Sequence, residues 1–94
     1  MQSFDLSKNF ISDKVGVMLA QGLKNNRSLK SFYLAENTLT EVTAVAFLLC
    51  LKNQNYLSKL DLSKNLIPIK FIIDINKLCE RNGENLDPVQ IPLL

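Results

Sequence analysis

"FDLSKN" at residues 4–9 is the most informative segment of the sequence, because related segments return as "FYLAEN" at residues 32–37 and "LDLSKN" at residues 60–65. The asparagines that end them, Asn9, Asn37 and Asn65, are 28 residues apart (37 − 9 and 65 − 37). The apolar residues around them move by the same step. A fixed period of this length is typical of proteins that stack one supersecondary unit on the next.

Within each unit the apolar spacing changes from that of a strand to that of a helix. Leu29, Phe32 and Leu34 suit a short half-buried strand in the second unit. Helical spacing of three or four residues then follows in the three units, through Val15, Met18, Leu19 and Leu23, through Val42, Ala46, Phe47 and Leu51, and through Phe71, Ile75, Leu78 and Cys79. Ser12 and Thr40 are expected N-caps, and Pro68 is expected in the first turn of the third helix.

The pattern Leu29-x-x-Phe32-x-Leu34-x-x-Asn37-x-Leu39, which residues 57–67 repeat, resembles the leucine-rich repeat family, and the 28-residue period resembles its ribonuclease-inhibitor-like class. The resemblance covers essentially the whole chain. It implies an α/β solenoid with parallel strands on a concave face and helices on a convex face. We expect a single domain, residues 1–94, with repeats at about 1–28, 29–56 and 57–85 and a terminal strand or cap at 86–94.

The two ends of the expected array differ. Met1 already occupies a core-leucine position, so the first strand should present an unpaired edge and an open apolar end. We expect such an end in a fragment of a longer array, or one that a neighbour covers. Pro88 and Pro92 suit an edge strand, because proline cannot donate to a ladder, and they favour closure at the C-terminal end.

The repeated asparagines are expected to be structural. An Asn amide can satisfy backbone groups where the chain leaves a strand, so Asn9, Asn37 and Asn65 should form a buried ladder. The variable positions between core residues remain for a partner. The candidate concave binding residues are Asp5, Ser7, Lys8, Ser31, Tyr33, Glu36, Lys59, Asp61 and Lys64. Tyr33 is of a type enriched at binding hot spots, although a surface tyrosine without a partner fits the sequence equally well.

A second candidate surface comes from apolar residues in excess of one core-facing stripe. They are Phe10, Leu66, Ile69, Ile72 and Ile73. A helix that is apolar around most of its circumference usually has neighbours on both sides, so we expect this surface to pack against another protein. Local repacking within the chain is the alternative.

Catalysis is not expected. The chain has no histidine, so a serine or cysteine nucleophile would lack its ordinary base. Asp5 and Asp61 fall two strands apart on an open surface, which is a weak basis for a glycosidase pair. Cys50 and Cys79 have neither zinc nor redox spacing and are expected to be reduced structural thiols. We therefore predict no catalytic residues, no cofactor, no metal and no small-molecule substrate.

Nucleic acid and membrane are also disfavoured. The formal net charge is only +2, although Lys24, Arg27, Lys30, Lys52 and Lys59 should gather at one edge. Two tyrosines and no tryptophan supply few stacking platforms for bases. The longest apolar run, residues 44–51, is far shorter than the ~20 residues that span a bilayer. We expect a soluble, cytoplasmic protein.

The family resemblance leaves function open, because leucine-rich repeat proteins include nuclease inhibitors, GTPase activators, innate-immune sensors, actin regulators and ciliary scaffold subunits. We expect a non-enzymatic protein-interaction module or assembly subunit whose partners are other proteins, with cytoskeletal and ciliary assemblies among its settings. The alternative is a fragment of a regulatory or sensing protein, such as an innate-immune receptor or a GTPase activator.

Overall fold

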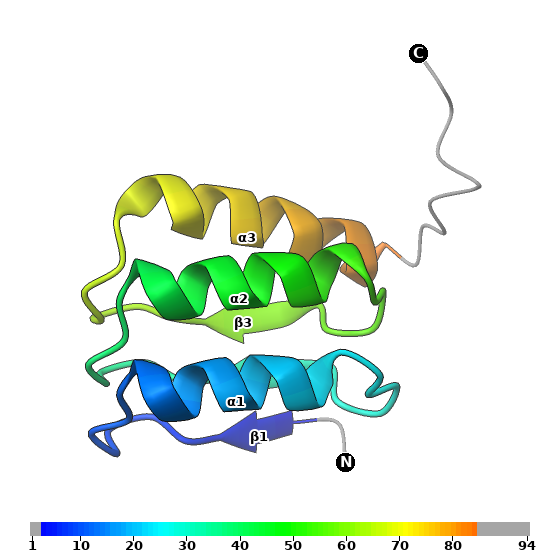
Figure 1. Cartoon of the computed structure of the whole chain (residues 1–94). Coiled ribbons are helices and arrows are strands. Elements are labelled where there is room, and N and C mark those ends of the chain that lie inside the picture. Colours follow the sequence, from blue (N-terminus) through cyan, green and yellow to red (C-terminus); the bar gives the residue numbers. More distant parts are fainter. Residues whose placement is uncertain (1–2, 85–94) are drawn as a thin grey trace.

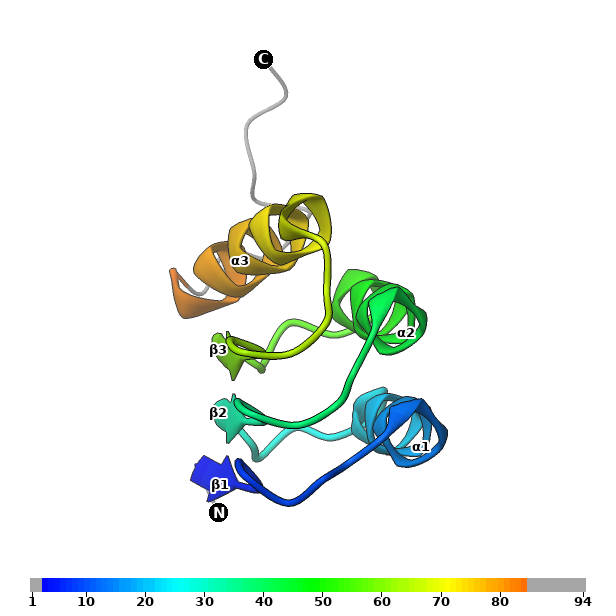
Figure 2. The same ribbon diagram turned by 90° about the vertical axis from the view of Figure 1, so that its left-hand side faces the viewer.

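The computed structural model describes residues 3–84. The elements alternate along the chain as β1 (Ser3–Asp5), α1 (Asp13–Leu23), β2 (Ser31–Tyr33), α2 (Glu41–Lys52), β3 (Lys59–Asp61) and α3 (Ile69–Gly83). The helices follow one another in chain order (Figure 1), and the strands form one parallel sheet in the order β1-β2-β3 (Figure 2). Parallel neighbours need a crossover connection, and α1 and α2 provide the two crossovers.

Strand pairing follows the spacing of the repeated hexapeptide. Phe4 lies opposite Phe32, and Phe32 lies opposite Leu60, each 28 residues further along the chain. The rings of Phe4 and Phe32 stack with centroids 5.7 Å apart, and Phe32 meets Phe47 of α2 edge-on at 6.4 Å. The apolar core therefore lies between the sheet and the helices, with Phe32 and Phe47 near its centre.

The third helix departs from the arrangement of the first two. Figure 2 shows α1 and α2 stacked beside the sheet, whereas α3 lies over β3 at one end of it. The C-terminal part of α3 is tied to the preceding loop, because Asn82 Nδ2 donates to the Leu57 carbonyl at 2.8 Å. Arg81 Nη2 donates to the carbonyls of Leu51 and Gln54 at 2.9 and 3.0 Å. The β3 side of the domain is thus closed by α3.

The prediction of a leucine-rich repeat solenoid is wrong. The described residues form a small α/β domain whose sheet has three strands of three residues and does not curl into a concave surface (Figure 2). So few short strands accumulate little curvature, and α3 covers the end where a further strand would extend the array. The expected terminal strand or cap at residues 86–94 lies outside the described residues.

One amide joins the loops that follow β1 and β2. Asn37 Oδ1 accepts hydrogen bonds from the backbone N–H groups of Asn9 and Ile11, both at 2.9 Å. Asn37 Nδ2 donates to the carbonyls of Leu6 and Leu34, both at 3.1 Å. The side chain therefore satisfies backbone groups of two successive units at once.

Asn65 makes the corresponding bonds one unit later. Its Oδ1 accepts from Leu39 N–H at 3.0 Å, and its Nδ2 donates to the Leu34 carbonyl at 2.9 Å. The three asparagines differ in burial, however: Asn37 is buried, Asn65 is half-buried and Asn9 is exposed. The expectation of a uniformly buried ladder is wrong for Asn9, because β1 is an edge strand and has no described neighbour on its outer side.

Replacing the central amide should destabilise the domain more than replacing the outer one. Asn37→Leu leaves buried backbone groups without partners and should lower the free energy of unfolding by about 1 to 3 kcal/mol. Asn9 Nδ2 bonds only to carbonyls of its own loop, so Asn9→Leu should lower it by less than about 1 kcal/mol. Urea denaturation followed by circular dichroism measures both, and equal midpoints for the two variants would contradict the central role of Asn37.

The starts of α1 and α2 are linked by a carboxylate. Asp13 Oδ1 accepts from Thr40 N–H at 2.9 Å and from Thr43 Oγ1 at 2.7 Å. Burial by itself raises the pKa of Asp13, but hydrogen bonds from Thr40 and Thr43 outweigh it, so the pKa lies below its ordinary value. The first turn of α1 is therefore held against the N-terminus of α2.

The predicted helix starts are correct in position for the first two helices. Thr40 caps α2, and its Oγ1 accepts from Val42 N–H at 3.3 Å. Ser12 occupies the N-cap of α1 without a side-chain hydrogen bond. Pro68 was expected in the first turn of α3 but precedes it as the N-cap residue, because α3 begins at Ile69.

Three residues expected in the core face outward instead. Val15, Met18 and Val42 are 44%, 62% and 55% exposed. On α1 the buried residues are Gly16, Ala20 and Leu23. Apolar spacing alone did not distinguish the side of α1 that contacts the sheet and α2 from the side that is exposed to solvent. The close contact of Gly16 with Leu39 and Thr43 fixes which side faces inward.

Gly16 and Gly22 of α1 should respond oppositely to alanine. A Cβ at Gly16 would lie 2.8 Å from Leu39 Cδ2 and would also collide with Thr43, whereas a Cβ at Gly22 meets nothing within 4 Å. Gly16→Ala should lower the free energy of unfolding by about 1 to 3 kcal/mol despite the better helix propensity. Gly22→Ala should raise it by up to about 1 kcal/mol. Thermal denaturation of the pair tests this, and a stabilised Gly16→Ala variant would contradict the close helix contact.

Candidate functional site

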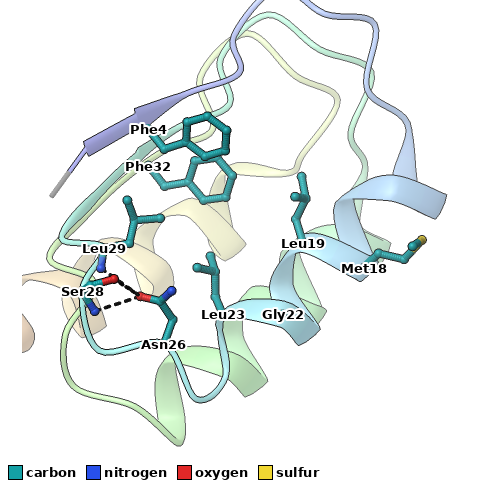
Figure 3. A pocket seen from close by; sticks show the side chains of 9 residues that line it. All are labelled: Phe4, Met18, Leu19, Gly22, Leu23, Asn26, Ser28, Leu29 and Phe32. Atoms are coloured by element: carbon teal, nitrogen blue, oxygen red, sulfur yellow. Dashed lines mark hydrogen bonds between the residues drawn. The ribbon is translucent and has the colours of Figure 1, made fainter. Parts of the chain in front are cut away.

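An open apolar groove lies between β1 and α1, at the end of the sheet away from α3 (Figure 3). Its volume is about 280 Å³. We call it the edge groove, and its lining residues are Phe4, Met18, Leu19, Gly22, Leu23, Asn26, Ser28, Leu29 and Phe32. Because apolar side chains dominate this lining, the groove is suited to an apolar side chain of a partner.

The groove exists because β1 has a neighbour on one side only. Phe4 and Phe32 occupy equivalent positions, yet Phe4 is 42% exposed and Phe32 is 1% exposed. One face of the Phe4 ring stacks on Phe32, and among residues 3–84 no strand pairs with the outer side of β1. Met18 lies at the rim on α1, and Leu19 and Leu23 face the groove from the same helix (Figure 3).

One end of the groove carries a polar side chain with unused bonding capacity. Asn26 Oδ1 accepts from the backbone N–H groups of Ser28 and Leu29 at 2.9 and 2.8 Å (Figure 3). Within the described part of the chain, Asn26 Nδ2 donates no hydrogen bond. It therefore offers a donor beside the apolar lining.

The sequence contained a signal for this amide that our sequence reasoning missed. Asn26, Gln54 and Asn82 are 28 residues apart (54 − 26 and 82 − 54). Gln54 Nε2 donates to the Leu23 carbonyl of the preceding unit at 3.3 Å, whereas Asn82 Nδ2 donates to the Leu57 carbonyl of its own unit. Asn26 is the first in this row, so its amide N–H has no earlier unit to contact within residues 3–84.

The loop at this end of the groove is basic. Lys24, Arg27 and Lys30 are all exposed. No ion pair to them is found among residues 3–84, where the recorded pair joins Lys8 and Glu36. The groove thus combines an apolar interior with a positively charged end.

Phe4 and Met18 are residues of this site that sequence reasoning did not single out for binding. Phe4 was treated as part of the repeated hexapeptide and Met18 as part of the helical spacing of the first unit. The difference between Met18 and its equivalents Ala46 and Asp74, one and two periods later, was the available signal. A large apolar residue appears only in the unit that has no described neighbour on its outer side.

The sheet residues expected to bind a partner do share a row. Asp5 lies opposite Tyr33, and Tyr33 lies opposite Asp61. The two carboxylates are engaged in turns, because Asp5 Oδ1 accepts from Ser7 N–H at 2.9 Å and Asp61 Oδ1 accepts from Ser63 N–H at 3.0 Å. The hydrogen bond from the Ser7 backbone is the main cause of the lowered pKa of Asp5.

Other candidates on this face have structural roles. Ser7 Oγ accepts from Ala35 N–H at 3.0 Å and so links two adjacent loops. Lys8, Glu36 and Lys64 adopt positive φ angles of 61°, 56° and 56° at equivalent turn positions. Lys8 Nζ lies 3.6 Å from Glu36 Oε2, and an exposed ion pair of this kind stabilises little.

The remaining two candidates lie at the strand starts. Ser31 is half-buried and lies opposite Lys59, which is exposed. A partner role for this face stays a prediction.

The second predicted surface divides into two parts. Phe10 and Leu66 are 90% and 70% exposed on the loops that follow β1 and β3. Ile69 and Ile73 are exposed on α3, whereas Ile72 is half-buried and packs against the core. Ile72 therefore belongs to the core, and a packing role for the four exposed residues stays a prediction.

The two cysteines lie away from the edge groove. Cys50 and Cys79 are buried free thiols that belong to the core. Burial raises the pKa of both, and raises that of Cys79 to about 11. A thiol with such a pKa is protonated at neutral pH and is a poor nucleophile.

Alkylation with iodoacetamide at pH 8 should separate the folded from the unfolded chain. A thiol of pKa about 11 is ionised in only about one molecule in a thousand at this pH. We expect intact-protein mass spectrometry to find Cys79 unmodified in the native chain and both cysteines modified in urea. Fast native labelling of Cys79 would show that its surroundings are open to solvent.

No helix within residues 3–84 combines the length and apolar character needed to cross a bilayer. The same residues contain no group of three cysteine, aspartate or glutamate side chains placed to hold a metal ion.

Comparison with known proteins gives a structural likeness only. No protein-family model matches the chain, and no curated protein matches it in sequence. Among solved structures, the chain is similar to "Leiomodin-1 Actin-Binding Site 2 (ABS2)", with 18% sequence identity and a TM-score of 0.68. The match covers 90% of this chain and 65% of that chain. That structure is named for actin binding and not for a repeat array, and at this identity the likeness concerns the fold alone.

Proposed function

We propose that this chain is a non-enzymatic protein-interaction module and that the edge groove is its binding site. The observation that carries the proposal is the exposure of two large apolar side chains, Phe4 and Met18, on either side of an open groove. Exposed apolar surface that is contiguous and rimmed by polar residues marks interaction sites. Aromatic and methionine side chains are among those enriched at interfaces.

The structural neighbour supports actin as the first partner to test. It is an actin-binding site, and its fold is similar over 90% of this chain. The chain spans 65% of that neighbour's length, so part of the neighbour has no counterpart in the match. A cytoskeletal partner would agree with a role in assembly.

The absence of histidine supports a non-enzymatic role. The thiols of Cys50 and Cys79 are buried and have raised pKa values, and Asp5 and Asp61 are bonded within turns. Neither pair offers an activated nucleophile or an acid–base couple in the edge groove. No observation favours the alternative of a sensor or GTPase-activator fragment.

A charge placed at the rim of the groove should weaken actin binding. Met18→Lys puts an ammonium group where an apolar partner side chain would pack, and we expect the dissociation constant for monomeric actin to rise at least tenfold. The matched control is Leu49→Lys, because Leu49 is 58% exposed on α2 and Met18 is 62% exposed on α1. We expect the control to bind actin as the unaltered chain does. Fluorescence anisotropy of labelled actin measures all three proteins.

Three other outcomes would count against the proposal. Equal affinities of Met18→Lys and the unaltered chain would place the interface outside the edge groove. Equal losses in both variants would indicate an interface on the helices rather than beside β1. No binding to monomeric or filamentous actin would reject actin as the partner.

A further inference from the structure

The outer edge of β1 offers a row of backbone acceptors. The equivalent acceptors on β2 bind β1 and so show how a further strand could bind at this edge. Asp5 lies opposite Tyr33, and Leu6 N–H donates to the Tyr33 carbonyl at 2.8 Å. In a parallel pair, successive residues direct their backbone groups to opposite sides. The N–H and C=O of Asp5 therefore face away from β2, along the open edge.

The pairing between β1 and β2 supplies the template for this edge. On β2, the carbonyls of Tyr33 and Ala35 accept from Leu6 and Lys8 N–H at 2.8 and 3.0 Å. The equivalent carbonyls on β1, one period earlier, are those of Asp5 and Ser7. The Ser7 carbonyl also accepts from Asn9 Nδ2 at 3.1 Å.

The Ser7 carbonyl oxygen can accept one more hydrogen bond besides the one from Asn9 Nδ2. Ala35 is its equivalent, and its carbonyl accepts from Lys8 N–H and from Asn37 Nδ2 together. Ser7 can therefore accept a second hydrogen bond from an added strand.

A side-chain acceptor extends the row. Asn37 Oδ1 accepts from two backbone N–H groups of the preceding loop, those of Asn9 and Ile11. Asn9 Oδ1 accepts no hydrogen bond from any residue in the described range 3–84. The open edge thus presents two carbonyls and one amide oxygen in the arrangement that β2 already uses to bind β1.

The edge groove lies beside this row and supplies a place for a side chain. Phe4 stacks on Phe32 at 5.7 Å, is 42% exposed and lines the groove. A residue in the corresponding position of an added parallel strand would stack on Phe4 as Phe4 does on Phe32. Main-chain bonds would then provide affinity and the groove would select an apolar side chain, as in other cases of strand addition.

Charge complementarity indicates what should precede that strand. The basic loop with Lys24, Arg27 and Lys30 leads into β2 at the N-terminal end of the parallel sheet. Asn26, in the same loop, adds an unused amide donor. Acidic residues just before the added strand would lie at this end, where their charge is attracted.

We infer that β1 and the edge groove bind an extended segment of a partner protein as a fourth parallel strand, with acidic residues preceding an apolar side chain that stacks on Phe4. This rests on the proposed function and specifies its mode of binding. The segment must present N–H groups two residues apart to the Asp5 and Ser7 carbonyls.

Residues 3–11, "SFDLSKNFI", give a direct probe, because this stretch already binds β2 in the required way. The first peptide is this sequence preceded by two glutamates. The second is N-methylated at the amides corresponding to Leu6 and Lys8, which should face β1. The third, a matched control, is N-methylated at those corresponding to Asp5 and Ser7, which should face away. Each is titrated into the full ¹⁵N-labelled chain and followed by NMR.

We expect the first and third peptides to shift the amide signals of Ser3–Asp5 and of the loop 24–30. Methylation of the Leu6 and Lys8 amides should weaken binding at least tenfold. Replacing the two glutamates by lysines should weaken it severalfold, and more at low salt than at high salt. Equal affinities of the two methylated peptides would overturn the inference. Loss of the β1 signals would also overturn it, because the peptide would then be replacing β1 on β2.

The outcomes separate this mode of binding from the proposed function. If no peptide binds but actin binding remains sensitive to Met18→Lys, the groove is an interaction site and strand addition is wrong. If the peptides bind in the expected register and actin does not bind, strand addition stands and actin is rejected as the partner.

Discussion

The side-chain amide of Asn37 connects two successive units of the fold through hydrogen bonds to their backbones. Each strand has only three residues, so the sheet ladder alone supplies few hydrogen bonds. The Asn37 amide adds three bonds of 2.9 to 3.1 Å between the loops after β1 and β2. The two loops that it joins turn in the same way, with positive φ angles at the equivalent residues Lys8 and Glu36. Polar side chains therefore complete a ladder that short strands could not provide.

The two ends of the sheet are physically different. At one end α3 packs over β3, and the side chains of Arg81 and Asn82 donate to carbonyls at the end of α2 and in the loop between α2 and β3. At the other end, the equivalent amide Asn26 has an unused donor and Phe4 keeps one ring face exposed. Groups whose equivalents elsewhere in the domain are hydrogen-bonded or buried are thus available at β1. This difference makes the β1 end the candidate interaction site.

Exposed strand edges are usually protected, because unpaired backbone groups can pair with another chain. Here Asp5, Lys8 and the basic loop place charges around the β1 edge while leaving its apolar groove open. Such an arrangement disfavours unselective pairing and favours a partner of complementary charge. It is consistent with an interaction module, and it differs from the α2 face, where the exposed residues Val42, Val45 and Leu49 have no backbone edge beside them.

The sequence alone predicts the order of elements, the strand register and the role of Asn37, because a 28-residue period brings like backbone and side-chain groups opposite one another. It led to the wrong overall architecture, since periodicity does not reveal where α3 leaves the row of helices. It indicated an unpaired edge and an open apolar end at the first strand but gave Phe4 and Met18 no binding role, because equivalent letters predict equivalent environments only where both neighbours exist. Only the tertiary structure showed that α3 packs over β3 and that Phe4 and Met18 line a groove at the opposite edge of the sheet. Both features depend on long-range packing between whole elements, and no local spacing records them.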